Sequence, residues 1–89
     1  MEQGNLKRLV MIEWVDSVGC SGWEYTEGME PIEPALCTSV GFLVDDSAEY
    51  KTIIQTISHR QVFGRTSIPS VAILRIMDLA GEVERAAVV

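Results

Sequence analysis

Histidine and cysteine are the scarcest of the residues that carry site chemistry in this chain of 89 residues, which holds only His59, Cys20 and Cys37. A structural zinc site takes four ligands at paired spacing, and the two cysteines form no C-x-x-C pair, so no metal is expected. His59 is also the sole imidazole base for a nucleophilic residue, and no spacing pairs it with one. We therefore expect no cofactor and no enzymatic activity, and we expect both thiols to stay free in a reducing cytoplasm.

Long apolar runs are missing as well. The apolar stretch that follows Lys7 and Arg8 is interrupted by Glu13 and Asp16, so neither a signal peptide nor a membrane span is predicted. The expected location is the cytoplasm.

Basic residues are few: seven lysines and arginines face thirteen aspartates and glutamates, which gives a net charge of −6. Such a chain repels phosphate backbones, so general nucleic-acid binding is disfavoured. Hydrophobic residues make up 47% and charged residues 22%, a balance typical of a folded core. The length suits one domain, residues 1–89, with 1–5 and 80–89 as flexible ends.

What the sequence does contain is a series of short β-rich runs. Turn residues and Pro69 separate them. Asp45 to Glu49 is predicted to form a hairpin turn, and Ser70 to cap one tight turn. Pro31 and Pro34 exclude a helix or central strand from 26–34, which is expected to be an exposed excursion. The predicted strands are 9–16, 36–44, 50–57 and 73–79, with 23–25 and 66–68 as shorter candidates and 59–65 as a basic connector.

Four to five short strands with short loops predict an all-β fold, either a barrel or a sandwich. Over residues 36–79, the strand order and the I-P-S-V-A-I-L-R-I segment resemble small SH3-like and Sm-like barrels. We expect such a barrel here, with a tail over 80–89 that frays or forms a short helix.

The chain also resembles small, mostly uncharacterised proteins of tailed bacteriophages and prophages. The resemblance covers about seventy positions and is carried by W-V-D-S at 14–17, G-W at 22–23, C-T-S-V-G-F-L-V at 37–44, I-P at 68–69 and Ile73. It implies an accessory product in the host cytoplasm, with antagonism of a host defence as one role. It transfers no residue function, because these proteins share no agreed activity.

The charges are distributed unevenly along the chain. Nine acids and no base lie between Arg8 and Lys51, whereas 51–77 contains four bases and no acid. One hypothesis is a loop that binds an anionic, nucleotide-like ligand, with arginines on phosphate and an aromatic ring for stacking. The alternative is that these arginines pair with acids of the same chain or of a neighbouring subunit. The candidate ligand residues are His59, Arg60, Phe63, Arg65 and Trp23.

A ligand bound at micromolar affinity needs a binding free energy of roughly 8 kcal/mol, which two arginines and one phenylalanine barely supply. A tight site therefore needs residues from more than one chain. A homo-oligomer is expected on this ground and because a short chain leaves much of its surface exposed. The leading hypothesis is thus a phage accessory protein that sequesters an anionic ligand at oligomer interfaces. The alternatives are an acidic protein-interaction module that blocks a host protein through residues 24–33, an Sm-like RNA-binding protein and, last, a hydrolase using Cys20 or Cys37.

Overall fold

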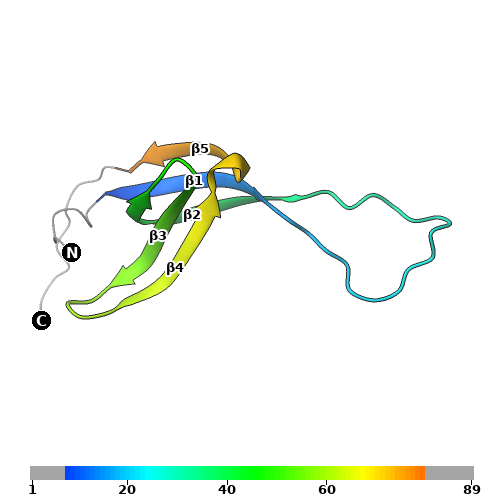
Figure 1. Ribbon diagram of the computed structural model, residues 1–89, viewed down its shortest axis with the longest axis horizontal. Coiled ribbons are helices and arrows are strands. Elements are labelled where there is room, and N and C mark those ends of the chain that lie inside the picture. Colours follow the sequence, from blue (N-terminus) through cyan, green and yellow to red (C-terminus); the bar gives the residue numbers. More distant parts are fainter. Residues whose placement is uncertain (1–7, 80–89) are drawn as a thin grey trace, which may run out of the picture.

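The computed structural model describes residues 8–79 as a single antiparallel sheet of five strands (Figure 1). The prediction of an all-β fold is confirmed. A single 3-10 turn is the only helical element in the part described, and none of its residues forms a helix long and apolar enough to cross a membrane. The elements are β1 (Leu9–Asp16), β2 (Ala35–Asp46), β3 (Tyr50–Ile57), β4 (Val62–Pro69), η2 (Ser70–Ala72) and β5 (Ile73–Asp78).

The strand order is β4-β3-β2-β1-β5, so the two strands that follow each other at the end of the chain lie at opposite edges of the sheet. Only η2 joins them. Four residue steps, from Pro69 to Ile73, span at most about 14 Å, whereas the edges of a flat five-stranded sheet are about 19 Å apart. The sheet must therefore curl until its edges approach, and Figure 1 shows this strong twist.

The concave face of the curled sheet holds the core. Its buried members come from four strands, β1 to β4, and Trp14, Ile73 and Ile76 pack against them. Trp14 also donates a 3.0 Å hydrogen bond from Nε1 to Ser39 Oγ, which satisfies the indole. The buried cluster consists of Val10, Ile12, Leu43, Ile53 and Ile68.

Most predicted strands agree with the structure, because each places β-branched or aromatic side chains on a half-buried surface. The runs 9–16 and 50–57 match β1 and β3. β2 is longer than predicted: Asp45 and Asp46 belong to the strand, with a register irregularity there, and the turn is reduced to 47–49.

Three local predictions are wrong. Residues 62–65 are the first half of β4 and not part of a connector, because their backbone pairs with β3 although every one of them is exposed. The segment 23–25 is not a strand. Ser70 does not cap the tight turn; Pro69 occupies that position without a side-chain cap, and the hydroxyl of Ser70 is buried without a partner. The ends 1–5 and 80–89, where flexibility or a short helix is expected, lie outside the described residues.

The link between β1 and β2 is the largest departure from a compact sheet. Residues 17–34, here called the arm, contain no strand or helix, and all are exposed. Figure 1 shows the arm extending away from the sheet along the long axis of the molecule, which measures 61 Å. The expected exposed excursion at 26–34 is confirmed, and it begins nine residues earlier than predicted.

Candidate functional site

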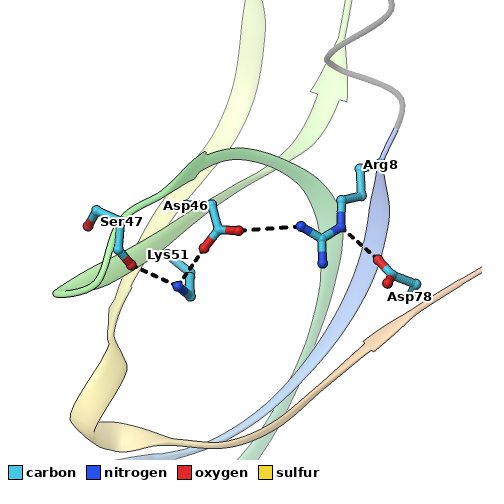
Figure 2. Close-up of polar contacts among 5 residues, drawn as sticks. All are labelled: Arg8, Asp46, Ser47, Lys51 and Asp78. Atoms are coloured by element: carbon cyan, nitrogen blue, oxygen red, sulfur yellow. Dashed lines mark hydrogen bonds and ion pairs between the residues drawn. The ribbon is translucent and has the colours of Figure 1, made fainter.

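A chain of ion pairs with aspartates engages two of the basic side chains, Arg8 and Lys51 (Figure 2). Arg8, just before β1, contacts Asp78 of β5 at 2.7 Å and Asp46 of β2 at 3.4 Å. Lys51 of β3 contacts the other oxygen of Asp46 at 2.5 Å and donates to the carbonyl of Ser47 at 2.7 Å. These contacts tie four strands together at one end of the sheet, so Arg8 and Lys51 serve the fold.

The same ion pairs shift the pKa values of Asp46 and Arg8. The hydrogen bond from Lys51 lowers the pKa of Asp46, aided by the charges of Lys51 and Arg8. The hydrogen bond to Asp78 raises the pKa of Arg8 above its usual value, and the charges of Asp78 and Asp46 add to it. Both shifts favour the ionised forms.

Arg75 is occupied in a similar way. It pairs with Glu13 on the neighbouring strand, where the two residues lie directly opposite each other in the register. Within residues 8–79, Arg60 and Arg65 have no carboxylate partner, and both are exposed. Lys51 and Arg75 therefore follow the hypothesis of pairing with acids of the same chain. Arg60 and Arg65 have no such partner among residues 8–79 and stay candidates for binding an anion.

The turn that presents Arg60 is held by its own hydrogen bonds. Ser58 Oγ accepts hydrogen bonds from the backbone N–H groups of Arg60 and Gln61, and its hydroxyl donates one to the carbonyl of Gln61. Ser58 N–H donates to that same carbonyl at 2.8 Å. His59 and Arg60 thus sit at a closed turn with their side chains in solvent.

Beyond the turn, Phe63 and Arg65 lie two residues apart on β4, so they share one face of the strand. Phe63 is 70% exposed. Gly64 between them has a φ of +75° and lies against the side chain of Gln55 on β3. We call 58–65 the basic hairpin; it brings together four of the five predicted ligand residues.

The fifth residue, Trp23, is not part of this group. It lies in the arm, which points away from the sheet at the end opposite the basic hairpin (Figure 1). Its side chain is fully exposed and takes no part in the core. One copy of the chain cannot place Trp23 beside Arg60 and Arg65.

The arm combines exposed apolar side chains with acidic ones. Trp23 and Tyr25 are 104% and 90% exposed, and Met29 and Ile32 are at least half exposed. Four glutamates alternate with these apolar residues, and the arm holds no basic residue. Its glutamates are Glu24, Glu27, Glu30 and Glu33.

Hollows on the surface are shallow and lie near both elements. One is at the base of the arm, lined by Val15, Asp16, Ser17, Val18, Ile32 and Pro34. Another lies on the basic hairpin, lined by Thr56, Ser58, Gln61, Val62 and Phe63. Neither His59 nor the two arginines line this second hollow, so its wall is uncharged and combines Val62 and Phe63 with three polar side chains.

The remaining reactive groups are dispersed. Cys20 is in the arm, Cys37 is at the start of β2, and both are free. Cys20 and His59 lie on elements at opposite ends of the molecule (Figure 1). In the described part of the chain, no three His, Cys, Asp or Glu residues gather as metal ligands would.

Comparison with known proteins gives no relative: no family model, no curated protein and no solved structure matches this chain. The site must be argued from its own geometry. Sequence reasoning missed that 17–25 belongs to the same exposed excursion as 26–34. The signal was present in the run D-S-V-G-C-S-G, whose small and turn-forming residues favour an extended loop over a strand.

Proposed function

We propose that this protein is a non-catalytic binding protein that holds a partner protein through the arm. The observation that carries the proposal is the complete exposure of residues 17–34, including Trp23 and Tyr25. Loops longer than about 12–15 residues without secondary structure are uncommon in compact domains and are usually functional. The hydrogen bonds that the described residues form within the arm are local, such as Met29 N–H to the Thr26 carbonyl.

The composition of the arm defines the partner surface. Tryptophan and tyrosine bury large apolar areas at modest entropic cost, and they are enriched among the residues that dominate binding energy. Glutamates between them steer association toward positive charge and reject acidic surfaces. The partner should therefore present arginine or lysine around an apolar depression.

The biological context belongs to the same proposal. The residues that carry the resemblance to phage proteins include Trp14, Leu43 and Ile68, which lie in or against the core. The strand order, with η2 between β4 and β5, supports the further proposal that the curled sheet is an SH3-like or Sm-like barrel. The resemblance also includes Gly22 and Trp23 of the arm. We propose that the host-antagonist role lies in the arm, whose partner is then a host protein.

The test uses immobilised full-length protein and host lysate. We expect specific partners, identified by mass spectrometry, to be captured by the wild type and to dissociate as salt rises. The variant with Glu24, Glu27, Glu30 and Glu33 all changed to glutamine should lose them, and so should Trp23→Ala. Glu49→Gln is the matched control, because Glu49 is an exposed glutamate in the β2–β3 turn.

All of these variants should keep the wild-type melting temperature, since arm residues make no core contact. Capture that is unaffected by neutralising the arm would overturn the proposal.

A second candidate function is the binding of an anionic ligand at the basic hairpin. It is favoured by Arg60 and Arg65, which lack a carboxylate partner among residues 8–79, and by the exposed ring of Phe63. Guanidinium groups bind phosphate in a bidentate manner, and a ring beside them can stack on a base.

Native mass spectrometry of the purified protein should then show a co-purifying nucleotide that the double variant Arg60→Ala, Arg65→Ala lacks at unchanged melting temperature. A variant that melts many degrees lower would assign these arginines to the fold.

A further inference from the structure

The arm and the basic hairpin are complementary in charge and cannot meet within one copy. The arm holds four glutamates and no base, and the basic hairpin holds His59, Arg60 and Arg65 and no acid. They lie at opposite ends of a molecule that is 61 Å long (Figure 1). If they bind each other, the contact joins two molecules.

We propose that the arm of one copy docks on the basic hairpin of a second copy. This inference rests on the proposed function, since it names a partner of the same arm. Charge decides the choice of surface: the other described bases, Arg8, Lys51 and Arg75, are already paired with Asp46, Asp78 and Glu13. Among residues 8–79, the basic hairpin is thus the surface that offers arginines without a carboxylate partner.

Apolar groups match as well. The basic hairpin has a shallow uncharged hollow whose apolar wall is Val62 and the 70% exposed Phe63, and the arm carries the exposed rings of Trp23 and Tyr25. An aromatic ring seated in that hollow would bring glutamates of the arm toward Arg60 and Arg65, which belong to the same hairpin. This arrangement has the form of a typical interface, with an apolar centre and charges around it.

The arm is also of adequate size. It contains 18 residues, close to the roughly 20–30 that each side of a stable interface uses. Docking would cover the large apolar side chains that the single chain leaves in water. It also joins Trp23 of one copy to the hairpin residues of the next, so that the five predicted ligand residues come together between copies.

The contact is head-to-tail, because an arm meets a hairpin and not another arm. An open assembly then keeps one free arm at one end and one free hairpin at the other, so it grows until it closes into a ring or extends as a filament. Self-association should therefore depend on both elements in the same chain and should weaken with salt.

The experiment is sedimentation velocity of the full chain over a wide concentration range at low and high salt. The wild type should sediment as a multiple of 9.8 kDa and dissociate toward that mass as salt rises. The arm-reversed variant (Glu24→Lys, Glu27→Lys, Glu30→Lys, Glu33→Lys) and the hairpin-reversed variant (Arg60→Glu, Arg65→Glu) should each bind themselves about a hundredfold more weakly or not at all.

Mixing the two reversed variants is the decisive measurement. The basic arm then faces the acidic hairpin, and the native arm faces the native hairpin, so the equimolar mixture should regain the wild-type mass. Circular dichroism checks that each variant is folded. If the hairpin-reversed variant does not fold, the neutral variant Arg60→Gln, Arg65→Gln takes its place in the self-association measurement. Glu49→Lys is the charge-matched control and should leave the assembly intact.

A wild type that stays at the mass of one chain, an assembly that survives both reversals, or a mixture that does not recover would overturn the inference. If self-association alone is not observed, the proposed function still stands, because arm-dependent capture of a host protein is measured separately. If neutralising the arm changes neither property, both are wrong.

Discussion

Gly64 is required by two features of the basic hairpin at once. Its φ of +75° is in the left-handed region that side chains disfavour, and a Cβ there would lie 2.6 Å from Gln55 Oε1 and 2.7 Å from Gln55 Cβ. The glycine therefore sets how Phe63 and Arg65 are presented on either side of it.

We predict that Gly64→Ala lowers the free energy of unfolding by about 1–3 kcal/mol, because the backbone is held in a strained conformation and Gln55 must move. Urea denaturation measures the change. Gly19→Ala is the control, since nothing lies within 4 Å of a Cβ at that position and its φ is not positive. Equal stability of the two variants would show that the hairpin adapts without cost.

Asp46 gives the fold a pH dependence of known sign. Its pKa is lowered in the folded protein by Lys51 and Arg8, so the unfolded chain binds a proton at a higher pH than the folded one. The stabilisation is complete above the usual aspartate pKa near 4 and is lost as the pH falls through the lower folded value.

Asp46→Asn should therefore reduce the melting temperature at neutral pH, and the difference from wild type should shrink as the solution is acidified below pH ~4. Asp45→Asn is the matched control: Asp45 is adjacent and exposed, and it belongs to none of the ion pairs seen among residues 8–79. A constant difference at every pH would show that the carboxylate charge is not the cause.

Among the elements, β4 depends most on its neighbours. Seven of its eight residues are exposed, and Ile68 alone is fully buried. Its backbone pairs with β3 from Tyr50↔Pro69 to Ile57↔Val62. Through Ile68, this edge strand reaches the core that β1 and β5 also contact, which holds the sheet in its curled form.

Ile68→Ala should lower the free energy of unfolding by about 2–5 kcal/mol, the range for buried aliphatic truncations. This is a large part of the roughly 4–13 kcal/mol expected for a domain of this size. Val62→Ala, a partly exposed aliphatic position in the same strand, should cost far less. Thermal melts followed by circular dichroism compare the two, and similar losses would mean that Ile68 does not anchor the edge.

At the scale of the whole molecule, the sheet and the arm are energetically separate. The arm makes no contribution to the buried cluster, and β1 and β2 pair along their full facing lengths from Leu9↔Phe42 to Asp16↔Ala35. The two strand ends that the arm joins are thus already neighbours.

Replacing 18–33 by a short turn should leave the sheet folded and raise its stability slightly, by about 1 kcal/mol, because a shorter loop costs less closure entropy. Circular dichroism and thermal melting measure this, and the same variant should no longer self-associate. An unfolded product would show that the arm is part of the fold.

The sequence by itself determined the secondary structure that depends on local pattern. β-Branched and aromatic runs ended by turn residues located β1, β3 and the final strand, and two prolines placed an exposed segment before β2. The first half of β4, residues 62–65, was hidden from this reasoning, because all four residues are exposed and show no alternation of buried and exposed positions. Their pairing with β3 makes them a strand.

Only the tertiary structure decided which charged side chains form ion pairs and which residues share a site. Sequence separation carries no information on whether Arg75 meets Glu13, 62 positions away, whereas sheet register does. The same register leaves Arg60 and Arg65 without partners among residues 8–79. The extended arm, in turn, separates Trp23 from the hairpin residues grouped with it, because no contact within one chain draws an uncovered loop back to the sheet.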